Sequence, residues 1–319
     1  MVTTQVLIIG AGPIGIACAL ECKKRKLEYI VLEKGTLTNS LFNYPLTMKF
    51  FSTSEKLEID NIPFISKDTK PGRDEALEYY RRVVTSNNLH IKLFEGVHSV
   101  QKDSDSFSVI SEKQTYRAKY VVTATGFYDI PKLLGVPGES LKKVSHYYKE
   151  AHPYVLQKNM VVGASNSAVD AALEIWRKGG EVTMIVRGTA IGDRVKYWVK
   201  PDIENRIKEG SIKAYFEAEI LEIKEQEVII STPKGRLTIE NDYVIALTGY
   251  RPNFEFLKSM GVQLDEEKLI PTYNELTMES NVKGLYLAGV ICGGTETHKW
   301  FIENSRIHAK MIVSDILNN

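Results

Sequence analysis

The chain has 319 residues, which is enough for two domains that each bury a hydrophobic core. Its 43% hydrophobic and 25% charged residues are ordinary for a globular protein, and a net charge of +1 disfavours nucleic acid or an anionic membrane as partner. No apolar run approaches the roughly 20 residues of a membrane-spanning helix, and the apolar start has no basic flank or cleavage site, so we expect a cytoplasmic protein without a membrane segment.

A strand–turn–helix–strand unit is predicted at the N-terminus. The strand is expected at 6–9, the helix at 16–24 and the second strand at 29–33. The turn reads Gly10-Ala11-Gly12-Pro13-Ile14-Gly15, which is the G-x-G-x-x-G pattern of a dinucleotide-binding turn. Its first glycine permits a tight turn, its second lets the backbone approach a pyrophosphate, and its third lets helix and strand pack closely. The helix N-terminus then attracts phosphates.

An acidic residue, Glu33, follows the second strand, 23 positions after Gly10. Its carboxylate can accept hydrogen bonds from both hydroxyls of an adenosine ribose. A 2′-phosphate would meet like charge there. The first turn is therefore interpreted as a site for FAD or NAD.

The segment after this unit is irregular in pattern. Residues 36–75 read as loop-rich, 75–87 as a helix and 91–100 as a strand. A hairpin is expected over 107–126, and it ends in a buried strand and the triplet Ala124-Thr125-Gly126.

A second strand–turn–helix–strand unit is predicted at 160–186, with its helix over 169–178. Its turn has the looser pattern G-x-S-x-x-A and comprises Gly163, Ala164, Ser165, Asn166, Ser167 and Ala168. Arg187 lies 24 positions after Gly163, and Arg194 and Lys196 follow it. Cations in place of an acid suit a 2′-phosphate and predict NADPH over NADH. The alternative is that Arg187 is simply solvated beyond the end of a strand.

The C-terminal part repeats the strand–Thr-Gly pattern once, in LTGYRPN at 247–253, and a further strand and glycine turn are expected in GLYLAGV at 284–290. A helix is expected over 300–317, and its apolar stripe comprises Ile302, Ala309, Ile312, Val313 and Ile316. The two turns and two Thr-Gly endings indicate two related nucleotide-binding domains.

Three cysteines, Cys18, Cys22 and Cys292, are too few for a disulfide framework and fit a reducing compartment. Cys18 and Cys22 share one face of the first helix and are interpreted as small core residues. The histidines have no metal-ligand spacing, so no metal is predicted.

The two turns, the two Thr-Gly endings and GLYLAGV together resemble the low-molecular-weight thioredoxin reductases over nearly the whole chain. The resemblance implies an α/β fold with two Rossmann-like dinucleotide-binding domains. The FAD domain would comprise 1–126 and 243–319, and the NADPH domain at 127–242 would be inserted into it.

The resemblance also implies the cofactor contacts. For FAD they are Gly10, Gly12, Pro13, Ile14, Gly15, Glu33, Lys34, Val97, Thr125, Gly126, Gly289, Val290, His298 and Lys299. For NADPH they are Gly163, Ala164, Ser165, Asn166, Ser167, Ala168, Arg187 and Arg194.

Two departures from the thioredoxin reductases bear on the reaction. Their Cys-x-x-Cys is absent, because the corresponding stretch at 143–159 has no cysteine, which excludes a dithiol relay to thioredoxin. Their Ala-Gly-Asp before the last helix is Ala-Gly-Val here, so backbone N–H groups near Val290 must replace a carboxylate.

Among such flavoproteins without a dithiol, the chain is most similar to the bacillithiol-disulfide reductases. The matching phrases are MKFFSTSEKLEI at 48–59, VKYWVKPDIENRIKEGSI at 195–212 and HKWFIENSRIHA at 298–309. The resemblance implies a homodimer or homotetramer that reduces a small-molecule disulfide, bacillithiol disulfide above all, by hydride transfer from NADPH to flavin N5. Some members carry a cysteine inside the first glycine motif, where this chain has Ile14.

Electrons must therefore leave the flavin directly or through another thiol. Cys292 is the candidate if His298 or Lys299 lowers its pKa, and the alternative is a small packing residue. His298 and Lys299, at the start of the last helix, would stabilise negative charge on the reduced flavin. Two other functions stay open: a ferredoxin- or flavodoxin-NADP reductase, and a non-enzymatic flavoprotein that senses NADPH.

Overall fold

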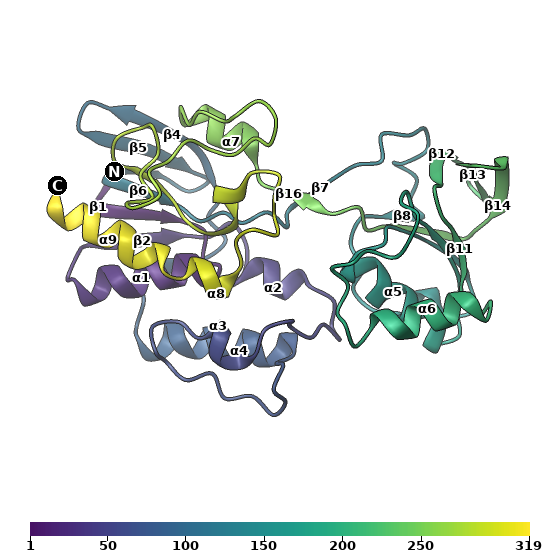
Figure 1. Cartoon of the computed structure of the whole chain (residues 1–319). Coiled ribbons are helices and arrows are strands. Elements are labelled where there is room, and N and C mark those ends of the chain that lie inside the picture. Colours follow the sequence, from purple (N-terminus) through teal and green to yellow (C-terminus); the bar gives the residue numbers. More distant parts are fainter. The chain divides into compact units, whose positions relative to one another are not determined.

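The computed structural model describes residues 1–319, which divide into two compact units (Figure 1). The first unit comprises Met1–Tyr44, Met48–Ile130 and Tyr250–Asn319. The second unit comprises Pro45–Thr47 and Pro131–Gly249. No helix in either unit combines the length and the apolar character that a bilayer crossing requires.

The first unit is built on a mixed sheet in which β17 pairs with β6 beside the order β3-β2-β1-β6-β5-β4. The strands on the β3 side of β6, and β17, run parallel, whereas β4, β5 and β6 are antiparallel neighbours. The bounds are β1 (Val2–Ile9), β2 (Tyr29–Leu32), β3 (Ile91–Lys92), β4 (Val97–Asp103), β5 (Ser106–Ser111), β6 (Thr115–Thr123) and β17 (Leu285–Leu287).

The helices of the first unit are α1 (Pro13–Lys24), α2 (Asn39–Asn43), α3 (Ser54–Leu57), α4 (Arg73–Ser86), α7 (Phe254–Ser259), α8 (Ile302–Ser305) and α9 (His308–Asn318), with a 3₁₀ turn η2 (Gly289–Gly293). Helix α1 starts directly at the glycine turn because Pro13 occupies its first position, where a missing N–H costs nothing. Lys23 and Lys24 in the last turn complement the helix dipole.

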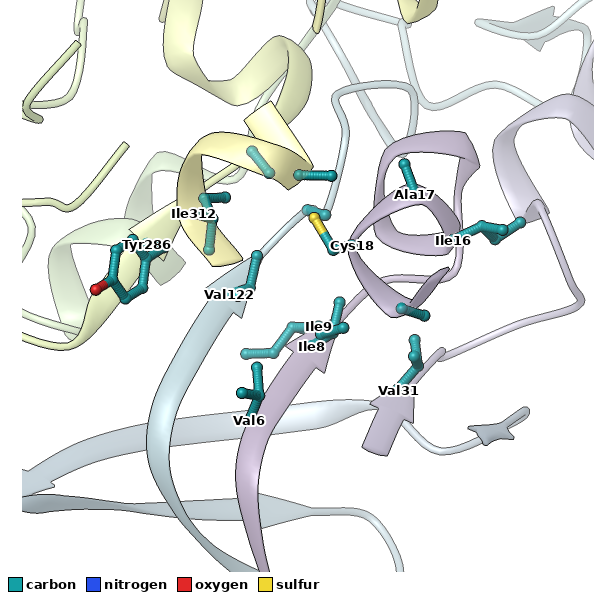
Figure 2. Close-up of a cluster of buried hydrophobic side chains, with 14 of the residues drawn as sticks. Val6, Ile8, Ile9, Ile16, Ala17, Cys18, Val31, Val122, Tyr286 and Ile312 are labelled. Carbon is teal, nitrogen blue, oxygen red and sulfur yellow. The ribbon is translucent and has the colours of Figure 1, made fainter. Parts of the chain in front are cut away.

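The core of this unit lies between the sheet and the pair α1 and α9. Figure 2 shows Cys18 of α1 among apolar side chains that include Ile9, Val122 and Ile312. Cys18 and Cys22 are both fully buried and unpaired, which confirms their interpretation as core residues.

The second unit has a parallel sheet of order β11-β10-β9-β15-β8 and an antiparallel sheet β12-β13-β14. The strands are β8 (Val144–Ser145), β9 (Lys158–Val162), β10 (Glu181–Ile185), β11 (Lys213–Tyr215), β12 (Glu219–Ile223), β13 (Glu227–Thr232), β14 (Gly235–Glu240) and β15 (Tyr243–Ala246). The helices are η1 (His152–Tyr154), α5 (Asn166–Arg177) and α6 (Lys200–Lys208).

Two two-residue strands, β7 (Ile130–Pro131) and β16 (Tyr250–Arg251), pair only with each other.

The predicted boundaries of the insert at 127 and 242 differ from those of the structure. Strand β15 pairs with β9 in the parallel sheet, so residues up to 249 belong to the second unit. The short stretch Pro45–Thr47 also belongs there, since the Leu46 N–H donates to the carbonyl of Lys149 (2.9 Å). A strand pairing determines the first assignment and a backbone hydrogen bond accompanies the second, and the sequence displays neither.

Three predicted segments differ from the structure. The strand expected at 91–100 is two strands, because Phe94 has a φ of +52° between β3 and β4. The loop-rich stretch 36–75 contains the short helices α2 and α3. The helix expected at 300–317 is two helices, α8 and α9, with Arg306 and Ile307 between them.

Candidate active site

The first glycine turn, residues 10–15, contains glycines of two kinds. A Cβ atom on Gly15 would lie 1.9 Å from the carbonyl oxygen of Gly10, and one on Gly10, whose φ is +104°, would lie 2.6 Å from that of Ala124. Packing alone requires both. A Cβ on Gly12 would meet no atom within 4 Å, and its φ of −71° suits any residue. The open space at Gly12 therefore fits a ligand that approaches the backbone there.

The N-terminus of α1 is equally suited to an anion. No side chain caps it, and its first turn contains no acidic residue. Its unpaired N–H groups and the positive end of the helix dipole therefore face the space beside Gly12. This arrangement fits the pyrophosphate of a dinucleotide.

Glu33 lies at the end of β2 and is only 6% exposed. One carboxylate oxygen accepts the Ala11 N–H (2.8 Å) and the other accepts the Gly35 N–H (2.9 Å). Burial raises the pKa of Glu33, and these two hydrogen bonds partly offset the effect. A carboxylate accepts about four hydrogen bonds, so lone pairs remain for ribose hydroxyls.

The neighbouring predicted FAD residues lie close to Glu33. Lys34 makes an ion pair with Asp129 (2.8 Å). The N–H of Glu95 donates to the carbonyl of Glu33 (2.8 Å), which brings the segment before Val97 alongside. The turn at 10–15 thus has an acidic residue and a neighbouring loop where the sequence predicts the adenosine ribose.

Three turns meet at the carboxyl ends of β1, β6 and β17. The Ala288 N–H donates to the Thr123 carbonyl (2.9 Å), and a Cβ on Gly289 would lie 3.3 Å from Cγ1 of Ile14. The structure therefore brings Gly10, Gly12, Pro13, Ile14 and Gly15 together with Thr125 and Gly126 and with Gly289 and Val290. The carboxyl edge of parallel strands is where α/β folds bind ligands.

His298 and Lys299 do not begin a helix, contrary to the prediction. Both are exposed and lie in the segment between η2 and α8, where the Lys299 N–H donates to the Glu296 carbonyl (3.0 Å). The helix dipole expected behind them is missing at these positions, since α8 begins at Ile302.

Cys292 is fully buried in η2. Burial raises the pKa of its thiol well above the ordinary value, and a backbone hydrogen bond and the nearby Lys299 oppose this shift without cancelling it. The lowered pKa on which a catalytic role depended is therefore absent, and the alternative of a small packing residue is favoured. A neutral buried thiol is a poor nucleophile.

Replacing Cys292 by alanine should leave turnover with the disulfide substrate that the resemblance implies within about twofold of the wild type, since a protonated, inaccessible thiol contributes no nucleophile. Steady-state kinetics with purified holoenzyme measures this. A loss of a hundredfold or more in kcat, with FAD content unchanged, would restore Cys292 as a catalytic residue.

His308, at the start of α9, was not singled out by the sequence analysis. Its Nδ1 accepts the Gly289 N–H (3.2 Å), and the residue is 1% exposed. Burial lowers its pKa to about 4, so the imidazole is neutral and carries its proton on Nε2. The sequence signal was its i, i+4 spacing to Ile312 on the apolar stripe.

The second glycine turn, residues 163–168, follows β9 and includes the first residues of α5. Gly163 has a φ of +127°, and a Cβ there would lie 2.7 Å from the Leu247 carbonyl. Ser165 precedes α5 without a side-chain hydrogen bond to it, and the first turn of α5 contains no acidic residue. This helix N-terminus also fits a phosphate group.

The cations behind this turn differ in availability. Arg187 and Arg194 are exposed and make no ion pair. Lys196, by contrast, is 8% exposed and pairs with Asp170 (2.7 Å). Two arginines, rather than three cations, are therefore available for a 2′-phosphate. Asn166 is also engaged, since its side chain bonds the backbone of Arg194 and Lys196.

No group of three or more histidine, cysteine or acidic side chains lies close enough together to hold a metal ion. All three cysteines are free thiols. Each unit has one candidate site, a glycine turn with its flanking residues.

This fold and these two turns define a dinucleotide-dependent oxidoreductase. The chain belongs to the pyridine nucleotide-disulphide oxidoreductase family, whose family model matches residues 7–289. It is an enzyme of that family, and its cofactors are FAD and NADPH.

Individual relatives resemble the chain over its full length. The bacilliredoxin reductase Bdr of Bacillus subtilis is 43% identical over 318 residues, which cover 99% of this chain and 98% of that protein. The solved structure of the bacillithiol disulfide reductase Bdr from Bacillus cereus has a TM-score of 0.97 and 43% identity, with 99% of each chain covered. The resemblance to this family is thereby confirmed.

The thioredoxin reductase of T. acidophilum, at 23% identity, has a TM-score of 0.78 with 99% of this chain and 100% of that chain covered. This likeness confirms the predicted α/β fold of thioredoxin-reductase type.

Proposed function

We propose that the chain reduces the disulfide of a low-molecular-weight thiol, bacillithiol disulfide in particular, at the expense of NADPH. The observation that carries this proposal is the 43% identity to a solved bacillithiol disulfide reductase across 99% of both chains. The two dinucleotide-binding turns support it, because each has the conformation and the open helix N-terminus that its cofactor needs.

The turn at 10–15 would hold the FAD pyrophosphate and Glu33 the adenosine ribose, with the turn at 289–293 beside them. When bound, FAD supplies the two-electron chemistry that links oxidation of NADPH to reduction of a disulfide. The chain's part is to bind and orient both nucleotides and to exclude water. A Cβ on Gly289 would lie 3.3 Å from Cγ1 of Ile14, so the Ile14 side chain borders this space and makes that part of its wall apolar.

The second turn would bind NADPH, with Arg187 and Arg194 on the 2′-phosphate. Guanidinium groups without an ion pair in the protein are free to bind phosphate oxygens with two parallel hydrogen bonds.

We propose further that no thiol of the chain relays electrons. Cys18, Cys22 and Cys292 are all buried, and burial raises the pKa of each thiol. A disulfide substrate would then receive electrons at the flavin without a mixed disulfide to the protein.

Rapid mixing of the holoenzyme with NADPH, followed by one acceptor at a time, tests the function. We expect fast bleaching of the flavin absorbance and reoxidation by bacillithiol disulfide. Reoxidation only by oxidised bacilliredoxin would show that the substrate is a protein disulfide instead of a small molecule. The Bacillus subtilis relative is named a bacilliredoxin reductase. Reoxidation only by ferredoxin or flavodoxin, or by no acceptor, would overturn the proposal in favour of a ferredoxin-type reductase or an NADPH sensor.

Replacing Arg187 by alanine should raise the KM for NADPH by roughly 10- to 100-fold, because a hydrogen bond between two charged groups contributes about 1.5–3 kcal/mol. The KM for NADH should change less than twofold. Steady-state kinetics with both nucleotides measures the ratio, and an unchanged ratio would remove Arg187 from the 2′-phosphate site.

Location in the cytoplasm and assembly into a homodimer or homotetramer remain predictions. Light scattering coupled to gel filtration measures the assembly directly.

A further inference from the structure

The segment 187–199, between β10 and α6, carries Arg187 and Arg194 and is called here the arginine loop. It is fastened to the second glycine turn at two points. At the first, the Gly192 N–H donates to the Ala164 carbonyl (2.9 Å), and a Cβ on Gly192 would lie 2.9 Å from the same oxygen. The loop therefore follows the turn closely at Gly192.

The second point is the side chain of Asn166. Its Nδ2 donates to the Arg194 carbonyl (3.0 Å), and its Oδ1 accepts the Lys196 N–H (2.8 Å). Only one orientation of the amide satisfies both bonds, since one partner is an acceptor and the other a donor. Both functional groups of Asn166 thus bind the loop on either side of residue 195.

The arginine loop is also held by the core of the second unit and by α5. Ile191 and Val195 are buried in the core of the second unit. Lys196 makes its buried ion pair with Asp170 of α5 (2.7 Å). The backbone around Arg194 is therefore held on both sides, whereas its guanidinium is exposed and has no ion pair.

We propose that Asn166 is a positioning residue for discrimination between NADPH and NADH: it fixes the backbone of Arg194 beside the glycine turn so that the guanidinium meets a 2′-phosphate. The proposal rests on the assignment of the second turn to NADPH. It adds to the expected contact of Asn166 with the cofactor, because one amide N–H and one oxygen lone pair remain beside the two bonds to the loop. The Lys196–Asp170 pair, one helical turn further along α5, holds the same loop.

Binding of the oxidised nucleotides to the FAD-loaded protein, followed by isothermal titration calorimetry, tests the proposal without turnover. In Asn166→Ala, we expect the Kd for NADP⁺ to rise about tenfold, as for one weakened bond between charged groups, and that for NAD⁺ less than twofold. Asp170→Asn, which removes the ion pair at constant volume, should act in the same direction. Asn205→Ala, an exposed asparagine of α6 outside the site, is the matched control and should change neither constant.

Two outcomes would overturn the role of Asn166. Equal weakening of NADP⁺ and NAD⁺ would show a general effect on the turn, and no change would show that the loop keeps its position unaided. Arg187→Ala and Arg194→Ala separate these results from an error in the underlying assignment. If neither arginine variant alters the ratio of the two constants, the 2′-phosphate site itself is misplaced.

Discussion

Gly12→Ala is expected to fold like the wild type and to purify with a reduced content of flavin. The Cβ would meet no protein atom within 4 Å, and the φ of −71° is ordinary for alanine, so the protein itself tolerates the methyl group. The same methyl would occupy the space that we assign to the FAD pyrophosphate. An intrusive methyl costs about 1–3 kcal/mol in a packed site, which weakens binding roughly 10- to 100-fold.

Gly15→Ala is the informative contrast within the same turn. Its Cβ would lie 1.9 Å from the Gly10 carbonyl oxygen, so the turn itself must deform. We expect this variant to be insoluble or grossly destabilised, with or without FAD.

Flavin absorbance of the purified variants and thermal unfolding of their FAD-free forms measure the two effects separately. Comparing FAD-free forms is necessary because bound FAD itself raises the apparent stability. If FAD-free Gly12→Ala unfolded far below the FAD-free wild type, Gly12 would be a packing glycine. If the variant retained FAD at full affinity, the pyrophosphate would lie elsewhere.

The free energy of unfolding of the wild type should decrease as the pH falls from about 6.5 to 4. The substitution His308→Asn should remove the part of this pH dependence that comes from His308. Burial holds the pKa of His308 at about 4 in the folded protein, below its ordinary 6.5, so the unfolded chain takes up the proton first. The stability contributed by neutral His308 is therefore complete above pH 6.5 and is lost as the pH falls towards 4. The full difference corresponds to roughly 3 kcal/mol, of which about 2 is lost by pH 5.

Asparagine suits this test because its Oδ1 can take the place of Nδ1 as acceptor of the Gly289 N–H, but it does not titrate. Urea unfolding of wild type and His308→Asn between pH 4.5 and 7.5 measures the slopes. His98→Asn, at an exposed histidine of β4, is the matched control and should keep the wild-type slope. Parallel slopes in all three proteins would show that His308 is not kept neutral by the fold.

The sequence was sufficient for the architecture because the glycine turns leave a local signature. Close backbone packing requires glycine at positions 10, 15 and 163. The spacing from Gly10 to Glu33 and from Gly163 to Arg187 follows from the length of one helix and one strand. These features depend on neighbours in the chain, so the α/β fold and both candidate turns were predictable.

The remaining features depend on residues far apart in sequence. Lys196 looked like a third cation for the cofactor, but Asp170 of α5 pairs with it and buries it. Cys292 looked activatable beside Lys299, but the surrounding core raises its pKa instead. Burial and partner choice of this kind arise only when the chain packs, so no local pattern reveals them.

The pairing of β17 with β6 has a consequence for synthesis. Strand β6 and its parallel neighbour β1 are both complete once residue 123 has been synthesised. The other parallel neighbour of β6 is β17, which begins at Leu285. Helix α9, which packs on α1, ends at Asn318. Every strand and helix of the second unit lies between Val144 and Ala246, so all of them are made before β17. During synthesis the inserted unit can therefore fold first, whereas the sheet of the first unit is incomplete until β17 has been translated.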